Sequence, residues 1–306
     1  MKGHPAIDEL RALDSLVRGA PLGGFIREAL VLRREGFGLA VLFTNSWRTA
    51  LFALLAGAPR RAGYRRMGRS LLLSDRLEAP RAGGRYEPSP MIDYYINLVR
   101  LIGVEPASRE MSLAVNRHER EAAEKLLDGL GVEPDASLVV MNPGSAFGSA
   151  KCWPPEHFAE SADRLTAEGF EVLVVTGPAE REIGETIGRL AKSRLKPAWR
   201  ANVPLGPLKA LISRAALVVT NDSGPRHFAA ALGVPVITII GPTDPRWSST
   251  GWRAEIVLRR EVECAPCMLR VCPRDHRCMT LVTPDDVMEA AMRLTGMKHL
   301  KGRNIE

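Results

Sequence analysis

The stretch 217–245, LVVTNDSGPRHFAAALGVPVITIIGPTDP, carries the residues best suited to bind an anion. The apolar run Leu217 to Thr220 predicts a buried strand, and the tetrapeptide Asn-Asp-Ser-Gly follows it directly. Pro225 suits the first turn of a helix, which we expect to end at Gly233. The start of such a helix offers backbone N–H groups and the positive end of the helix dipole to a phosphate. Taken alone, the tetrapeptide is equally compatible with a simple helix cap.

A second loop, NPGSAFGSAKCWPPEHF at 142–158, has a similar chemistry. Gly144 and Gly148 allow a ligand to approach the backbone closely, and Lys151 adds a positive charge just before a helix expected from Pro155. A glycine-containing loop, a lysine and a helix N-terminus are the parts that hold a diphosphate. The loop lacks the Gly-Lys-Ser/Thr ending of a Walker A motif.

A third loop, TGPAERE at 176–182, places two acids after another expected strand. Glu180 or Glu182 could accept hydrogen bonds from a ribose or a base. When these residues are considered alone, a solvated acid in the first turn of a helix is the favoured interpretation.

Four of the five cysteines are close together in the sequence, with His276 among them. Thiols and an imidazole can form a zinc site or hold an iron–sulfur cluster, but this spacing matches no standard pattern of either kind. A bound metal, a local thiol pair and buried free thiols therefore all stay open, and we predict no metal. An odd number of cysteines favours reduced thiols in the cytoplasm. The four candidates are Cys264, Cys267, Cys272 and Cys278.

The formal charge of +7 is unevenly distributed, because the stretch 59–69 holds five arginines and no acidic residue. Such a cluster can meet nucleic acid, an anionic membrane surface or a phosphorylated ligand, or it can be a solvated basic face. Nucleic acid is not favoured, since the arginines lack interleaved aromatic residues and the cysteines lack a finger pattern.

Alternating strands and helices must position these loops. Strands are expected near residues 138, 172, 217 and 236, each followed by a helix or a polar loop, which predicts a parallel sheet with right-handed crossovers. All loops that follow parallel strands meet at one edge, where open α/β sheets bind ligands.

The first part of the chain is less regular. We expect a strand at 39–44, a helix at 47–56, short strands at 62–64 and 71–73, and a loop at 79–90. The 306 residues suggest two domains. The linker-like GVEPDAS at 131–137 predicts a boundary that divides the chain into 1–133 and 134–306, with the last helix packing back on the first domain.

Taken in order, the segments NPGS…AKCWPPEHFAE, TGPAERE and TNDSGPRHFAAALGVPVITIIGPTDPRW resemble the ADP-heptose:lipopolysaccharide heptosyltransferases, most of all their heptosyltransferase II members. The segments FTNSWRTALFALLAGAPRRAGYRRMGRSLLL, PMIDYYINLVRLIG and CAPCMLRVCPRDHRCMTLVTPDDV fit as well. The resemblance implies an α/β fold of the GT-B type, in which two Rossmann-like domains face a cleft. The first would take a lipid acceptor and the second a nucleotide sugar.

The resemblance also implies roles for particular residues. The donor-binding residues would be Ser145, Lys151, Glu180 (or Glu182), Asp222, Ser223, Gly224 and His227. The acceptor-binding residues would be Arg48, Arg60, Arg61 and Arg65. The implied reaction transfers heptose from ADP-heptose to the lipopolysaccharide inner core, with lipid A–Kdo–heptose as acceptor, with inversion and without a cofactor. We expect a cytoplasmic monomer, bound peripherally to the inner membrane, with no nucleic-acid partner.

The chain departs from the family at its start. Family members open with an apolar strand and a Gly-Asp loop about 50 residues upstream of the equivalent of Gly3, and the Asp of that loop is the proposed general base. The catalytic Asp is thus expected upstream of Met1, neither Asp8 nor Asp14 takes its role, and the N-terminal domain is expected to be incomplete. We therefore expect little transferase activity from the 306 residues. The alternatives are a GT-B enzyme with a different nucleotide sugar, or an inactive remnant that binds the donor.

Overall fold

The computed structural model describes residues 4–16 and 21–297. These residues form two compact units, which we describe separately. The C-terminal unit comprises residues 4–8, 110–245 and 250–297, and the N-terminal unit comprises 9–16, 21–109 and 246–249. Within these ranges, no helix combines the length and the apolar character that crossing a bilayer requires.

The C-terminal unit is built on a parallel sheet of five strands in the order β10-β9-β8-β6-β7. Its two central strands, β6 and β8, are buried along their whole length, as expected when both faces of a parallel sheet are covered. The four predicted strands are confirmed, whereas β10 was not predicted, because EIVL is a short, half-buried strand at the edge of the sheet. The strands are β6 Leu138–Asn142, β7 Glu171–Val174, β8 Leu217–Asn221, β9 Val236–Ile239 and β10 Glu255–Leu258.

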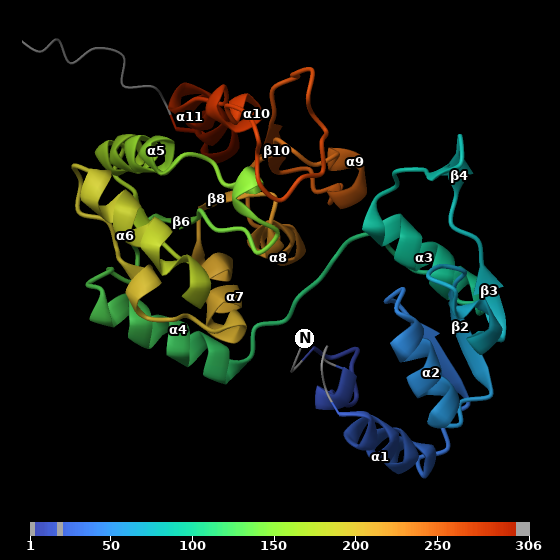
Figure 1. Ribbon diagram of the computed structural model, residues 1–306. Coiled ribbons are helices and arrows are strands. Elements are labelled where there is room, and N and C mark those ends of the chain that lie inside the picture. Colours follow the sequence, from blue (N-terminus) through green and yellow to red (C-terminus); the bar gives the residue numbers. More distant parts are fainter. Residues whose placement is uncertain (1–3, 17–20, 298–306) are drawn as a thin grey trace, which may run out of the picture. The chain divides into compact units, whose positions relative to one another are not determined.

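Helices cover both faces of this sheet, and alternate strand residues supply the two cores. Val139 and Met141 of β6 pack with residues of α5, α6 and α11, while Leu138 and Val140 pack with residues of α4, α7 and α8. Figure 1 shows α4 along α7 and α11 beside α5. This is the doubly wound arrangement that the alternating pattern predicts. The helices are α4 Arg117–Gly129, α5 Pro155–Ala167, α6 Arg181–Leu190, α7 Leu205–Arg214, α8 Gly224–Leu232, α10 Arg277–Thr280 and α11 Pro284–Thr295. The short helix α9, Pro245–Ser248, has its first residue in this unit and the rest in the N-terminal unit.

The helix after β8 follows its sequence signals closely. Pro225 lies in the first turn of α8, where its missing N–H costs no hydrogen bond. Gly233 ends the helix in the left-handed conformation, with φ of 75°, which glycine adopts without strain. The predicted bounds of α8 are thereby confirmed.

The N-terminal unit has a smaller parallel sheet in the order β1-β2-β3. The expected strand at 71–73 is wrong, since Arg69–Leu72 forms the 3-10 helix η2 and the third strand follows it. The expected loop at 79–90 contains the short hairpin β4–β5. The elements are α1 Leu22–Arg33, β1 Leu39–Leu42, α2 Trp47–Leu55, β2 Arg60–Tyr64, β3 Asp75–Leu77, β4 Arg81–Ala82, β5 Arg85–Tyr86 and α3 Met91–Leu101.

The two units divide at residues 109 and 110, upstream of the predicted boundary at 133 and 134. The reason is α4, whose Ala123 and Leu127 belong to the apolar core of the C-terminal unit. Lys209 of α7, only 3% exposed, also has its ammonium 2.8 Å from the carboxylate of Glu119 in α4. The last described helix, α11, packs against α5 of its own unit, and residues 298–306 lie outside the described part of the chain.

Candidate functional site

The carboxyl ends of β6 and β8 are the topological switch point of the larger sheet. These strands are neighbours, yet the chain passes from β6 outward to β7 and from β8 outward to β9 on the other side. Helices on opposite faces therefore leave a crevice beyond the two strand ends, which is where open α/β sheets bind ligands. The loops at 143–151 and 222–224 begin there, as predicted.

Two buried asparagines, each the last residue of its strand, fix the shape of the first loop. The Asn221 side chain donates to the Pro143 carbonyl oxygen at 2.6 Å and accepts from the Trp153 backbone N–H at 3.1 Å. Asn142 donates to the Val175 carbonyl oxygen at 2.8 Å, which ties β6 to the loop after β7. Our sequence candidates omitted both residues, although an amide side chain at the end of each central strand was a usable signal.

Ser223 does not cap α8, although it occupies the N-cap position. Its hydroxyl lies 3.3 Å from the Asn142 side-chain oxygen and 3.0 Å from the Thr220 hydroxyl, so it points toward β6 and β8. The Ser223 side chain makes no capping hydrogen bond to this helix start, and Gly224 there is exposed. This geometry disfavours the simple-cap interpretation, because the first N–H groups of α8 are left to a ligand or to water.

Lys151 is held at the same place by a buried carboxylate. Its ammonium lies 2.7 Å from Asp222 Oδ2 and 3.1 Å from the Asp222 carbonyl oxygen. The other partners of Asp222 are the Arg226 guanidinium at 3.0 Å and the Thr243 hydroxyl at 2.9 Å. Burial by itself would raise the pKa of Asp222, but the hydrogen bond and charge of Lys151, together with Arg226, lower it to about 2. Asp222 is therefore ionised, and its carboxylate orients the Lys151 ammonium.

Arg226 extends this network away from the crevice. It is 1% exposed and also pairs with Glu255 of β10, which in turn accepts hydrogen bonds from Thr238 and Thr250. The neighbouring His227 is half-buried, and burial followed by the positive charge of Arg226 lowers its pKa. His227 is thus favoured in its neutral form beside the start of α8.

Glu180, in the loop that follows β7, points toward Gly144 and Gly177. The Glu180 carboxylate accepts from the Gly177 backbone N–H at 3.1 Å and lies where a side chain on Gly144 would be. Ser145 follows Gly144 on the same loop and is half-buried. The structure therefore brings Ser145, Lys151, Glu180, Asp222 and Ser223 to one edge of the sheet.

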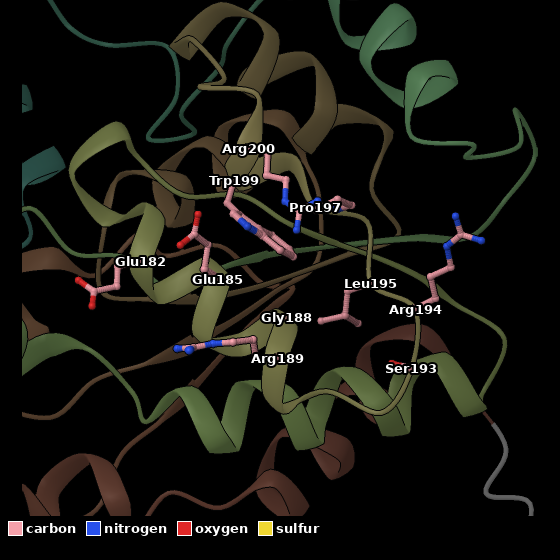
Figure 2. A pocket seen from close by; sticks show the side chains of 10 residues that line it. All are labelled: Glu182, Glu185, Gly188, Arg189, Ser193, Arg194, Leu195, Pro197, Trp199 and Arg200. Atoms are coloured by element: carbon pink, nitrogen blue, oxygen red, sulfur yellow. The ribbon is translucent and has the colours of Figure 1, made fainter.

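Glu182, the alternative acid, has a different environment. It lines a cavity of about 600 Å³ between α6 and the segment 193–200 (Figure 2). The floor includes Trp199, whose indole packs on Gly184 and Gly188 of α6, where larger side chains would collide. Of the predicted donor residues, only Glu182 lines this cavity, so the cavity and the crevice beyond β6 and β8 are lined by different residues. The lining residues are Glu182, Glu185, Gly188, Arg189, Ser193, Arg194, Leu195, Pro197, Trp199 and Arg200.

The cysteine segment braces the glycine loop. The Arg270 carbonyl oxygen accepts from the Ala150 N–H at 3.0 Å, and the His276 ring nitrogen lies 2.8 Å from the Ala150 carbonyl oxygen. The Arg270 guanidinium also lies 5.6 Å from the centre of the Phe147 ring. His276 therefore has a structural contact on the loop that holds Lys151.

The cysteines themselves are free thiols. Burial, and then the neighbouring thiols of Cys264, Cys272 and Cys267, raise the pKa of Cys278 to about 11. Across residues 4–16 and 21–297, no three His, Cys, Asp or Glu side chains form a group that could hold a metal ion.

Two of the predicted acceptor-binding arginines, Arg48 and Arg61, make hydrogen bonds within the N-terminal unit. Arg48 donates to the Ser15 carbonyl oxygen at 2.7 Å, and its guanidinium lies 4.9 Å from the centre of the Phe25 ring. Arg61 donates through Nε to the Leu72 carbonyl oxygen at 2.8 Å. These contacts stabilise the fold of the unit.

The other two predicted acceptor arginines form exposed ion pairs. Arg60 lies 2.9 Å from Asp75, and Arg65 pairs with Glu78. Exposed pairs of this kind are weak in water, so both arginines can exchange their partners for an anionic ligand.

Residues 27–277 match the family model described as glycosyltransferase family 9 (heptosyltransferase). The chain belongs to this family. Two curated relatives are 30% identical to it. One is lipopolysaccharide heptosyltransferase 2 of Salmonella typhimurium, aligned over 70% of this chain and 62% of the relative. The other is lipooligosaccharide heptosyltransferase 2 of Haemophilus influenzae, aligned over 70% and 63%. The chain thus spans less than two thirds of the length of these relatives.

Two solved structures of the family share the fold. The family 9 glycosyl transferase of Veillonella parvula superposes with a TM-score of 0.81 at 25% identity, covering 96% of this chain and 84% of that one. E. coli ADP-heptose LPS heptosyltransferase II superposes with a TM-score of 0.73 at 27% identity, covering 90% and 81%. The predicted fold class, an α/β fold of the GT-B type, is confirmed by these family 9 structures.

Proposed function

We propose that this family 9 chain is a heptosyltransferase that takes heptose from ADP-heptose and transfers it to the lipopolysaccharide inner core. The C-terminal unit would bind the donor, and the N-terminal unit the acceptor, lipid A–Kdo–heptose. The single observation that carries the donor assignment is the uncapped start of α8 beside the ammonium of Lys151. The similarity to heptosyltransferases supports the choice of heptose as the sugar.

The donor diphosphate would lie between the glycine loop and α8. Gly144 and Gly148 let the diphosphate oxygens approach the backbone. Lys151 and the backbone N–H groups at the start of α8 would stabilise the negative charge of these oxygens. Ser145 supplies a further hydroxyl, and Glu180 lies at the adenosine end. Asp222 is a positioning residue here, since its carboxylate is already occupied by Lys151, Arg226 and Thr243.

Transfer would invert the anomeric carbon. The acceptor hydroxyl gives its proton to a general base and attacks that carbon from the face opposite to the phosphate, the bond from carbon to the β-phosphate oxygen breaks, and ADP leaves. The negative charge that develops on the leaving phosphate would be stabilised by Lys151 and the dipole of α8, which are both in place before the reaction. No step uses a metal or a cofactor.

The acceptor chemistry fits the arginines of the N-terminal unit. The lipid-linked core carries phosphate and carboxylate groups, for which Arg60 and Arg65 can leave their exposed acidic partners. Arg48 and Arg61 would act mainly by holding the unit in shape. Because the acceptor is a membrane lipid, we infer that the protein acts at the cytoplasmic face of the inner membrane, and we propose that it does so as a monomer.

Titration calorimetry tests the donor site. ADP and ADP-heptose should bind the wild-type chain, and Lys151→Ala should abolish measurable binding. Lys125→Ala, which removes one exposed lysine from α4, is the matched control and should bind normally. Equal affinity of Lys151→Ala and wild type would refute the site.

Turnover with a heptose acceptor tests the reaction. Product formation supports the transferase and would refute the expectation of little activity from the 306 residues, whereas donor binding without turnover agrees with that expectation and with an inactive donor-binding protein. Tight binding of another nucleotide sugar, with no response to ADP-heptose, would assign a different donor.

A further inference from the structure

The loop 65–72 of the N-terminal unit presents two large apolar side chains to solvent. Met67 is 74% exposed and Leu71 is 89% exposed. No other large apolar side chain in the described residues is as exposed as Leu71. Single exposed apolar residues are common on protein surfaces, so exposure alone says little. What distinguishes this loop is how it is held.

A buried arginine holds the loop from below. Arg69 is 0% exposed, donates through Nε to the Tyr64 carbonyl oxygen at 3.0 Å, and also donates to the Thr44 carbonyl oxygen and, at 3.3 Å, to the Asn45 side chain. Burying a guanidinium is costly, and these acceptors offset the cost. The loop is thus anchored to the end of β1.

The backbone of the loop is also fixed. Met67 and Gly68 have φ of 55° and 73°, a tight left-handed turn. Arg61 closes the far end by donating to the Leu72 carbonyl oxygen at 2.8 Å. Because hydrogen bonds hold both ends, we describe the loop as a stiff tip, with Met67 and Leu71 exposed to solvent.

The sequence on both sides of this tip is rich in arginine. The stretch 59–87 contains eight arginines and three acidic residues. The guanidinium groups of Arg66 and Arg81 lie 3.8 Å and 4.5 Å from the centre of the Tyr86 ring. Both arginines therefore stack against one aromatic side chain. Arg65, next to the tip, pairs with the exposed Glu78.

We propose that the loop 65–72 docks the protein on an anionic lipid bilayer, with Met67 and Leu71 inserted at the boundary of headgroups and acyl chains. A stiff apolar tip beside arginines matches such a surface, since it gains both apolar burial and attraction to lipid phosphates. Nucleic acid would use the arginines but would gain nothing from Met67 and Leu71. The reason for the protein to visit a membrane rests on the proposed function, whereas the docking itself can be tested apart from it.

The test is co-sedimentation of the full chain with vesicles of phosphatidylglycerol and phosphatidylcholine, and with vesicles of phosphatidylcholine alone. The wild-type chain should prefer the anionic vesicles. The double variant Met67→Ser/Leu71→Ser should lower the partition coefficient on the order of tenfold, with no change in the thermal transition, because both side chains are exposed. Leu205→Ser, which alters a side chain 70% exposed in the C-terminal unit, is the matched control and should bind like the wild type.

A charge variant completes the test. Arg65→Gln/Arg66→Gln should remove the preference for anionic vesicles while the apolar tip is kept. Unchanged binding of the Met67→Ser/Leu71→Ser variant, or a wild type that binds single-stranded DNA but neither kind of vesicle, would overturn the proposal. If vesicles bind through the loop but ADP does not bind in calorimetry, the proposed function fails and the docking loop stands.

Discussion

The ammonium of Lys151 lies 2.7 Å from the carboxylate of Asp222, although 71 residues separate them in the sequence. Only 13% of the Lys151 side chain and 6% of the Asp222 side chain are exposed. Because lysine is long and flexible, a buried carboxylate at this point holds the charge in place before a ligand arrives. Asp222 thus supports the anion site without facing it.

We expect Asp222→Asn to weaken ADP binding on the order of tenfold and to destabilise the C-terminal unit by about 2–4 kcal/mol. The amide keeps the shape but leaves the positive charges of Lys151 and Arg226 without their shared counter-ion. Calorimetry and urea unfolding measure the two effects. Asp285→Asn, which alters an exposed ion pair with Arg164, should change stability by less than about 0.5 kcal/mol. Similar results for both variants would contradict the buried role of Asp222.

The same carboxylate predicts how stability depends on acid. The folded-state pKa of Asp222, about 2, lies below its ordinary value of 3.8, so its stabilising contribution is present above the ordinary value. As the pH falls from about 4 to about 2, the unfolded state takes up the proton first, and a contribution on the order of 2 kcal/mol is lost. Urea midpoints across this range should therefore fall more steeply for the wild type than for Asp222→Asn. Parallel curves would show that Asp222 does not have the lowered pKa.

The sequence predicted the loops that meet beyond β6 and β8 because its signals are local. Strand, turn and helix preferences around Pro225 and Gly233 act within a few residues, and parallel strands then bring the loops to one edge. The groups with which an arginine side chain pairs, by contrast, are not determined by neighbouring residues in the sequence. Five arginines in 59–69 look alike in the sequence, yet Arg69 is buried while Arg65 stays exposed. That difference depends on the carbonyl oxygens of Thr44 and Ser46, which lie 25 and 23 residues upstream between β1 and α2, and no local pattern reveals them.

Glycine at position 148 should be required for the loop that holds Lys151. Gly148 has φ of 149°, and a side chain there would collide with the Arg270 carbonyl oxygen that braces the loop. We expect Gly148→Ala to cost about 1–3 kcal/mol and to weaken ADP binding at least roughly tenfold. Gly129→Ala, where nothing lies within 4 Å of the added carbon, should be neutral or stabilise α4 by up to about 1 kcal/mol. Tolerance of alanine at position 148 would show that the loop can move.

Arg69 should be the most sensitive arginine of the N-terminal unit. Arg69→Met removes the donors for the carbonyl oxygens of Tyr64 and Thr44, and should destabilise the unit by about 2–4 kcal/mol. Hydrogen exchange of the residues in β1 and β2 measures the change directly. Arg100→Met, which breaks the exposed pair with Glu105, is the control and should lie within about 0.5 kcal/mol of the wild type. If the amide hydrogens of β1 and β2 exchange at the same rates in the two variants, Arg69 does not anchor the loop.

The division of the chain can be tested with fragments that start on either side of α4. A fragment of residues 110–306 keeps the ion pair between Glu119 and Lys209, and it also keeps Leu127 in the apolar core. A fragment of residues 134–306 loses both, which opens Lys209 and the apolar surface under α4 to water. We expect the shorter fragment to be less stable by at least about 3 kcal/mol, or not to fold.

Substitutions separate the two causes of that loss. Lys209→Met in the shorter fragment should restore little of the stability, because without α4 the Lys209 ammonium is open to water and the loss comes mainly from the exposed apolar surface. In the full chain, Glu119→Gln should lower the urea midpoint, while Glu121→Gln, which alters an exposed pair with Arg117 on the same helix, should not. Equal stability of the two fragments would place the boundary back at residues 133 and 134, because α4 would then contribute nothing to the C-terminal unit.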